Sequence, residues 1–389
     1  MRITDLMGKD LSIYVHIPFC VRKCLYCDFL SDSADEGVIK EYFSALSKEI
    51  WMHSEKYRNY TVKSVFFGGG TPSFPDEKYI VAVLKQIKKC FFLDSDAEIS
   101  IESNPGTVSY EKLKAYRDAG INRLSIGAQS LCDDELKRLG RIHDSRAFFE
   151  TYEMARRAGF DNINVDVMSA LPRQSLKSYM STLEKVVELR PQHISAYSLI
   201  IEEGTPFYDM DLDLPSEEED REMYHETKRF LSENGYHRYE ISNYALDGYE
   251  CYHNKVYWMR GNYLGLGIGA ASMVNDVRWS NIRDIDSYVG AFRKLDTNLS
   301  EVVITDKQIL KKSECMEEFM FLGLRLVRGV GVKEFKENFG KSILEVYGNV
   351  IEKYKRMGLL EYDPEGRYLR LTDEGLDVSN TVMADFLLE

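Results

Sequence analysis

The sequence lacks the features of a membrane-spanning or nucleic-acid-binding protein. No segment approaches the run of about 18 apolar residues that a membrane-spanning helix requires. Residues 1–6 contain neither the apolar stretch nor the small-residue cleavage site of a signal peptide. Acidic residues outnumber basic ones by 63 to 50, and the net charge of −13 disfavours non-specific binding to nucleic acid. These absences predict a cytoplasmic protein with no transmembrane segment and no nucleic-acid partner.

The sequence also lacks the paired cysteines of a disulfide framework. It contains seven cysteines, an odd number. Four of them stand alone in the sequence: Cys90, Cys132, Cys251 and Cys315. Such isolated thiols favour a reducing compartment, in which cysteines stay free or hold a metal. The other three lie within eight residues, at Cys20, Cys24 and Cys27.

The spacing of these three cysteines, C-x3-C-x2-C, suits an iron–sulfur cluster. A [4Fe–4S] cluster usually takes four cysteine ligands, so three nearby thiolates leave one iron open for chemistry. The alternative is a structural zinc site, which requires four ligands. His16 offers a fourth, but no second C-x2-C pair is present. The cluster explains the spacing better.

Short apolar segments alternate with amphipathic helical patterns over residues 1–200. The expected strands cover residues 11–17, 62–67, 98–103, 122–127, 162–167 and 193–199. The expected helices cover residues 36–54, 78–91, 109–119, 145–158 and 176–189. In the fourth helix, Ser145 is the expected N-cap and Gly159 the expected end. This alternation predicts parallel βαβ units, and six of them favour an incomplete (β/α)6 barrel of the α/β class.

The pattern changes after residue 200 and again near residue 300. We expect an acidic loop over 209–220, a helix ending near 232, a strand over 236–242 and an aromatic, glycine-rich loop over 249–272. Further helices are expected over 313–327, 332–338 and 343–357, then a hairpin over 360–371 and a last helix after Thr372. This order resembles a winged helix and predicts two domains, 1–300 and 301–389.

A winged-helix arrangement raises the possibility of DNA binding, which the charge disfavours. Residues 313–389 carry 10 basic and 15 acidic side chains. A lid or a partner-docking module fits this charge better. Phe319, Phe321 and Phe335 are the candidate docking surface, and the alternative is that they form the core of the domain.

Two further groups of residues indicate a polar ligand at the ends of the strands. Gly68-Gly69-Gly70-Thr71-Pro72 follows the second strand, where glycines let the backbone approach a ligand closely. It is not a Walker A loop, because no Gly-Lys-Ser/Thr follows. Polar side chains then recur at or after the ends of later strands: Glu102, Gln129, Arg141 and Asp166. Each alone is explained by solvation, but four together favour a shared polar ligand.

The last motif is His253-Asn254-Lys255-Val256-Tyr257-Trp258. Its histidine and aromatic residues are suited to a flat ligand, and histidine is a common ligand of haem iron. From residue types alone, a packed loop with a hydrogen-bonded histidine is the simpler explanation.

Taken together, these motifs resemble the oxygen-independent coproporphyrinogen III oxidase family of radical S-adenosylmethionine (SAM) proteins. The resemblance extends over nearly the whole chain and includes the segment Glu102-Ser-Asn-Pro and the C-terminal domain. It implies a [4Fe–4S] cluster on Cys20, Cys24 and Cys27. It also implies contacts to SAM from Tyr14, Gly69, Gly70, Thr71, Glu102, Gln129, Arg141 and Asp166. Tyr26 matches an aromatic position beside a second SAM molecule.

The chain departs from the oxidases at one informative position. The oxidases carry a fourth cysteine two residues after the last cluster ligand, where this chain has Phe29. The His-Asn-x-x-Tyr-Trp motif at residues 253–258 is typical of a sister group, the HemW-type haem chaperones. That resemblance implies haem as cargo, with His253 as a candidate iron ligand, and delivery to haem-accepting respiratory proteins at the membrane. It also implies that this cytoplasmic chain associates with the periphery of the membrane.

The resemblance leaves the reaction open and assigns no catalytic residue. The oxidase reaction, the oxidative decarboxylation of coproporphyrinogen III in porphyrin biosynthesis, is the alternative function. A radical SAM reaction on an unrelated substrate is a weaker third possibility.

Overall fold

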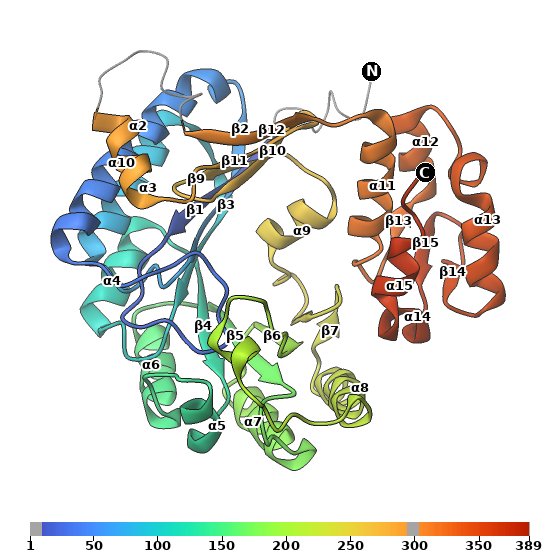
Figure 1. Ribbon diagram of the computed structural model, residues 1–389, viewed down its shortest axis with the longest axis horizontal. Helices are drawn as coiled ribbons and strands as arrows, with labels where there is room; N and C mark the ends of the chain where they lie inside the picture. Colours follow the sequence, from blue (N-terminus) through green and yellow to red (C-terminus); the bar gives the residue numbers. More distant parts are fainter. Residues whose placement is uncertain (1–9, 294–302, 389) are drawn as a thin grey trace.

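The computed structural model describes residues 10–293 and 303–388 and consists of an open α/β barrel beside a smaller helical domain (Figure 1). Six parallel strands form the barrel: β1 (Asp10–Ile17), β2 (Thr61–Gly69), β3 (Phe92–Ser103), β4 (Arg123–Gln129), β5 (Asn162–Ser169) and β6 (His193–Ser198). The helices between them are α2 (Glu36–Tyr57), α3 (Glu77–Cys90), α4 (Tyr110–Ala119), α5 (Asp133–Arg138), α6 (Ser145–Arg157) and α7 (Leu176–Glu188). The predicted strand–helix alternation is confirmed.

Burial on both faces explains why the sequences of these strands are almost continuously apolar. All seven residues of β4 are buried, and β1 and β5 are buried at most positions. A parallel sheet is covered by helices on one face and by the barrel interior on the other, so both faces exclude water. Leu124, Ile126, Ile163 and Val165 belong to the resulting core. The carboxyl ends of the six strands consequently share one end of the barrel.

The sheet continues beyond both ends of the six-stranded barrel and stays open. Its strand order is β12-β11-β10-β9-β1-β2-β3-β4-β5-β6-β8-β7, so β12 and β7 are its two edges. The additional strands are β7 (His237–Arg238), β8 (Asn243–Ala245), β9 (Tyr263–Leu266), β10 (Ala271–Val274), β11 (Val277–Asn281) and β12 (Ile304–Ile309). η1 (Pro206–Asp209), α8 (Glu217–Glu233), α9 (Tyr252–Trp258) and α10 (Ile285–Arg293) connect them.

Three local predictions were wrong. The single strand expected over residues 236–242 is the two-residue β7, with β8 starting at Asn243. The loop expected over 249–272 contains α9 and β9. Both errors have the same cause. A strand of two or three residues is too short to show alternation of apolar and polar side chains, and a helix of one or two turns is too short to show a helical repeat of apolar residues. The N-cap of α6 is Asp144, whose carboxylate accepts a hydrogen bond from Ala147 N, so Ser145 is the first helical residue.

The C-terminal domain has the predicted helices and hairpin around a core of its own. It comprises α11 (Lys312–Gly323), β13 (Val330–Gly331), α12 (Val332–Phe339), α13 (Ile343–Arg356), β14 (Leu360–Tyr362), β15 (Tyr368–Leu371), α14 (Asp373–Asp377) and α15 (Ser379–Ala384). The hairpin gains β13 to form a three-stranded sheet. Phe319 and Phe335 are buried in the core, and Phe321 packs against it. These phenylalanines therefore serve as core rather than as an exposed docking surface.

Ion pairs attach this domain to the barrel at two places, and α9 lies between the barrel and the domain in Figure 1. The carboxylate of Glu318 pairs with Arg260 at 2.8 Å and with Arg278 at 2.7 Å. Asp377 on α14 pairs with Arg221 of α8 at 3.0 Å. The domain thus closes the side of the barrel that the sheet leaves open. No helix in the described ranges is long and apolar enough to cross a bilayer.

Glu49, a fully buried carboxylate on α2, yields a prediction about stability. It accepts hydrogen bonds from Gly267 N at 2.7 Å, Asn281 Nδ2 at 2.6 Å and Tyr288 Oη at 2.5 Å. Burial raises the pKa of Glu49 from 4.5 to about 7. The folded state therefore holds this proton more tightly than the unfolded state, and the contribution of Glu49 to stability falls as the pH rises from about 4.5 to 7.

Glu49→Gln should remove this decline, because glutamine does not titrate. In urea unfolding, the free energy of the variant relative to wild type should shift in favour of the variant by up to about 3 kcal/mol between pH 5 and pH 8. Glu41→Gln, on the exposed part of the same helix, is the control and should show no such shift. If the difference in unfolding free energy between wild type and Glu49→Gln does not depend on pH, the raised pKa of Glu49 is contradicted.

Candidate functional site

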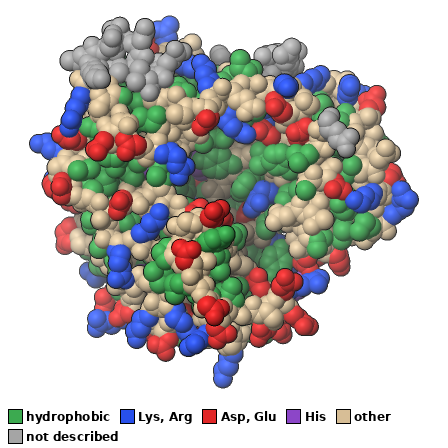
Figure 2. Space-filling view, in the orientation of Figure 1, with side chains coloured by type: hydrophobic (Ala, Val, Ile, Leu, Met, Phe, Trp, Pro, Cys, Tyr) green, Lys and Arg blue, Asp and Glu red, His purple; other side chains and the backbone are tan. Residues whose placement is uncertain are grey.

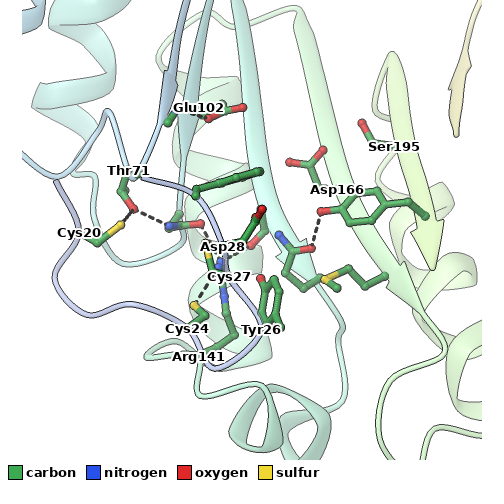
Figure 3. Close-up of a pocket in the computed structure, with 18 of the residues that line it drawn as sticks. Cys20, Cys24, Tyr26, Cys27, Asp28, Thr71, Glu102, Arg141, Asp166 and Ser195 are labelled. Atoms are coloured by element: carbon green, nitrogen blue, oxygen red, sulfur yellow. Dashed lines mark hydrogen bonds between the residues drawn. The ribbon is translucent and has the colours of Figure 1, made fainter. Parts of the chain in front are cut away.

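A cavity of about 450 Å³ lies where the carboxyl ends of the strands meet the loop after β1 (Figure 3). Most of the residues predicted from sequence line it: Cys20, Cys24, Tyr26, Cys27, Gly69, Gly70, Thr71, Glu102, Gln129, Arg141 and Asp166. Tyr14 and His253 instead line an adjoining cavity of about 190 Å³. Glu102 and Asp166 line both cavities, so the two are neighbours in the barrel interior.

The three cysteines face this cavity from the loop between β1 and α2. All three are free thiols, with Cys20 buried and the other two half-buried. Cys20 Sγ lies 3.3 Å from Thr71 Oγ1, and Arg141 Nη1 donates to Cys24 Sγ at 3.7 Å. Burial raises the pKa of Cys27 to about 11. A thiol in such a place becomes a thiolate when it binds a metal.

The geometry favours a cluster over a zinc ion. No three His, Cys, Asp or Glu side chains among the described residues converge on a single metal ion. His16 is already engaged, through Nε2 with Leu30 O at 2.8 Å and through Nδ1 with Tyr14 Oη at 3.1 Å. A four-iron cube takes one thiolate on each of three different irons, which allows the sulfurs to stay apart. The thiols of one loop around one cavity fit that requirement.

The glycines after β2 are needed for packing between loops. Gly69 has φ +115°, and a Cβ there would lie 2.6 Å from the His16 ring. A Cβ on Gly70 would lie 2.9 Å from Phe19 O. Gly70 N donates to Ile17 O at 2.9 Å, and Thr71 N donates to Phe19 O at 2.8 Å. The glycines therefore let this loop lie directly against the cysteine-bearing loop.

Glu102 and Asp166 place two buried carboxyl groups in the cavity. Burial, together with the nearby charge of Asp166, raises the pKa of Glu102 to about 8. Gly69 N donates to Glu102 Oε2 at 3.2 Å. Burial also raises the pKa of Asp166, whose oxygens accept hydrogen bonds from Asn164 Nδ2 at 2.7 Å and Ser125 Oγ at 3.1 Å. A cationic ligand would favour the ionised form of both groups.

A chain of side-chain hydrogen bonds joins the two loops to Arg141. Thr71 Oγ1 accepts from Asn104 Nδ2 at 2.8 Å, and Asn104 Oδ1 accepts from Arg141 Nη2 at 2.7 Å. Arg141 Nε is buried and has no hydrogen-bond partner, so the guanidinium keeps a donor for an anionic group. In Figure 3, the cysteines and Arg141 lie at one end of the cavity and Glu102 and Asp166 at the other.

Gln129 and Tyr197 add a strained contact on the cavity wall. Gln129 is the last residue of β4 and has φ +64°, a left-handed conformation that costs a non-glycine residue roughly 1–2 kcal/mol. Its Oε1 accepts a hydrogen bond from Tyr197 Oη at 3.1 Å. Strain of this kind tends to occur at functional sites. Sequence reasoning missed Asn104 and Tyr197; only the Glu102-Ser-Asn-Pro segment pointed toward Asn104.

His253 lies inside the barrel rather than on a surface loop. It is 1% exposed, and both ring nitrogens have partners: Nδ1 lies 2.8 Å from Ser64 Oγ, and Nε2 lies 2.9 Å from Tyr257 Oη. Burial lowers its pKa to about 3, which keeps the imidazole neutral. To ligate iron, the ring would have to give up one of these hydrogen bonds. Asn254, the next residue, lines both cavities.

Comparisons with known proteins agree with this architecture. Residues 14–186 match the radical SAM superfamily, and residues 310–378 match the HemN C-terminal domain. The chain is similar to the haem chaperone HemW of Bacillus subtilis (strain 168), with 36% identity over 97% of this chain and 99% of that protein. It is also similar to the haem chaperone HemW of Escherichia coli (strain K12), with 39% identity over 68% of this chain and 70% of that protein.

A solved structure shares the fold across both domains. The coproporphyrinogen III oxidase HemN of Escherichia coli, a radical SAM enzyme, superposes with a TM-score of 0.84 over 99% of this chain and 92% of that chain. The sequence identity between the two is 23%. The incomplete barrel with a helical C-terminal domain is thereby confirmed.

Gln129 provides a test of the strain at the cavity wall. Gln129→Ala and Gln129→Gly both remove the hydrogen bond to Tyr197, but only glycine relieves a positive φ. We expect the glycine variant to be more stable than the alanine variant by about 1 kcal/mol in urea unfolding. Equal stabilities, or a more stable alanine variant, would show that Gln129 is not strained.

Proposed function

The chain belongs to the HemW family of radical SAM proteins, and on this premise we propose that it binds haem and passes it to haem-requiring respiratory proteins. The observation that carries the proposal is the identity of 36% to a haem chaperone over nearly the full length of both proteins. Phe29 supports it. This residue occupies the position of the oxidases' fourth cysteine, lines the cavity and is 60% exposed.

We further propose that the chain holds a [4Fe–4S] cluster and SAM in the larger cavity. Cys20, Cys24 and Cys27 would hold the cluster, and this donor set fits for the geometric reasons given above. The cluster would supply redox chemistry, and the iron without a cysteine ligand would be available to SAM. The buried carboxyl groups and the free Nε of Arg141 match the positive and negative groups of SAM.

Each side chain has a distinct role in this proposal. Glu102 and Asp166 accept hydrogen bonds from an ammonium or from ribose hydroxyls. Arg141 would donate from Nε to a carboxylate while its Nη2 stays bonded to Asn104 Oδ1 and Gly127 O. The burial of these groups excludes water and thereby strengthens each charged contact.

The alternative function is the oxidation of coproporphyrinogen III, because the chain shares its fold with a radical SAM enzyme that carries out this reaction. A paired experiment separates the two functions. Under anaerobic conditions with SAM and a reductant, the chain should form no vinyl product from coproporphyrinogen III. Loaded with haem, it should restore haem-dependent activity to membranes of haem-depleted cells faster than the same amount of free haem does. Vinyl product at enzyme-like rates, or failure to bind haem, would refute the chaperone function.

The raised pKa of Glu102 predicts how SAM binding depends on pH. Above about pH 8 the carboxyl group of Glu102 is ionised, and the sulfonium of SAM stays positively charged at every pH. The affinity for SAM should therefore rise as the pH increases from 6.5 to 9. One charge-assisted hydrogen bond contributes about 1.5–3 kcal/mol, so Glu102→Gln should bind SAM roughly tenfold more weakly at pH 9. At pH 6.5 the two proteins should differ little.

Calorimetric titration across this pH range measures both effects. Glu202→Gln, which changes an exposed carboxylate on the rim of the same cavity, should keep the wild-type slope. If the affinity of Glu102→Gln for SAM depends on pH as strongly as that of the wild type, Glu102 does not contact SAM.

A further inference from the structure

A second large cleft, of about 520 Å³, lies between the barrel and the C-terminal domain. Its lining comes from β7, from α9 and the residue after it, and from two segments of the C-terminal domain: His237, Arg238, Tyr239, Glu250, Tyr252, Lys255, Met259, Leu326, Val327, Arg328 and Arg370. Figure 2 shows the molecular surface hollowed where the two domains meet. None of these residues lines either of the cavities at the strand ends.

Basic side chains outnumber acidic ones in the lining of the cleft, with four basic side chains and a single carboxylate. Lys255 pairs with Glu250 in the lining, and Arg370 pairs with Glu361 beside it in an ion pair that is partly exposed and therefore weak. Arg238 also pairs with a carboxylate outside the lining, Asp373. Arg328 is exposed, and among the described residues no carboxylate lies within ion-pair distance of it. Such a surface is suited to a ligand that carries more than one carboxylate.

The rest of the lining is suited to a flat apolar ligand. Tyr239 and Leu326 are buried at 6% and 4% exposure, and Tyr252, Met259 and Val327 are half-buried. Aromatic and aliphatic walls with a few polar groups are typical of small-molecule sites, whose volumes are about 300–1,000 Å³. The cleft lies within this range, whereas the cavity of about 190 Å³ beside His253 falls below it.

His237 is placed like a histidine that can bind iron. Its ring is half-buried, with Nε2 3.2 Å from Glu250 Oε1 and Nδ1 3.3 Å from Asp247 Oδ1. Asp247 is fully exposed, so its contact with Nδ1 is weak and easily broken. A metal-binding histidine usually donates its second N–H to a carboxylate, and Glu250, itself held by Lys255 at 2.6 Å, provides one.

α9 separates this cleft from the barrel interior. Tyr252, Lys255 and Met259 recur at helical spacing and face the cleft, whereas His253 and Tyr257 recur at i and i+4 and face the interior. The His-Asn-x-x-Tyr-Trp motif thus builds the wall between the two sites. Trp258 stacks with Arg325 of the C-terminal domain at 4.3 Å, which fixes the wall to that domain.

We propose that haem binds in this cleft between the domains, with its two propionates on Arg328 and Arg370 and its iron on His237. The inference rests on the proposed function, because haem is taken as the cargo. The proposed iron ligand is therefore His237, which lines the cleft, and not His253, the candidate from sequence. Met259, whose Sδ accepts a hydrogen bond from Arg328 at 3.1 Å, places a second soft donor in the cleft.

Haem titration followed by absorbance tests the proposal in the full-length protein. His237→Ala should change the Soret spectrum and weaken haem binding at least tenfold. The double variant Arg328→Ala/Arg370→Ala should weaken binding of both haem and iron-free protoporphyrin, since both carry the propionates. His237→Ala should leave protoporphyrin binding unchanged, because that ligand lacks iron.

A matched control distinguishes loss of the site from loss of folding. The double variant Arg356→Ala/Arg367→Ala changes two exposed residues outside the cleft and should keep wild-type haem binding. All variants should retain wild-type affinity for SAM, which shows that the barrel is intact. Wild-type haem binding that persists in both cleft variants, or that is lost only in His253→Ala, would overturn the cleft while leaving the chaperone function standing. Failure of the wild type to bind haem would overturn both.

Discussion

The close packing of the glycine loop after β2 against the chain leaving β1 is the constraint on which the larger cavity depends. A side chain at Gly69 would collide with His16, and one at Gly70 would collide with the backbone of Phe19. Because both positions are glycine, Thr71 reaches Cys20, and Gly69 N reaches Glu102. One backbone contact thus sets the position of a thiol and of a buried carboxyl group at the same time. The chemistry expected of the cavity follows from their being held together.

The open sheet has a second consequence. A closed barrel would cover its own interior, but here α9 and the C-terminal domain cover the side between β9 and β8. The ion pairs of Glu318 and Asp377 hold that domain at two places, and the cleft lies beside the shared wall. The motif at residues 253–258 therefore forms an internal wall with one side toward the barrel interior and the other toward the proposed haem cleft. If haem binds in the cleft as proposed, one short motif can be typical of a haem chaperone without itself binding iron.

The parts of the fold that sequence predicted are those with strong periodicity. Strands such as β4 and β5, buried on both faces, and helices such as α7 have patterns that are hard to misread. The short elements β7, β8 and α9 are held by tertiary contacts, for example by Glu98, which accepts hydrogen bonds from the backbone of Tyr252 and His253. No local pattern shows such a contact.

The same limit applies to the sites. The cavity at the strand ends was predictable because parallel strands bring their carboxyl ends together, so Glu102 and Asp166 were expected at the same end of the barrel. The strain at Gln129 and the hydrogen bond from Tyr197 depend on backbone angles that the sequence does not show. The cleft brings His237 of the barrel together with Arg328 and Arg370 of the C-terminal domain. No residue spacing in the sequence predicts this contact between domains.

We propose that three thiolates hold a cluster with one iron open toward the larger cavity. Electron paramagnetic resonance of the anaerobically reconstituted and reduced protein tests this arrangement most directly. We expect a [4Fe–4S]+ signal whose g values change when SAM is added, and no such signal when Cys20, Cys24 and Cys27 are all replaced by alanine. A full cluster signal in the triple variant, or a wild-type signal that SAM leaves unchanged, would contradict it.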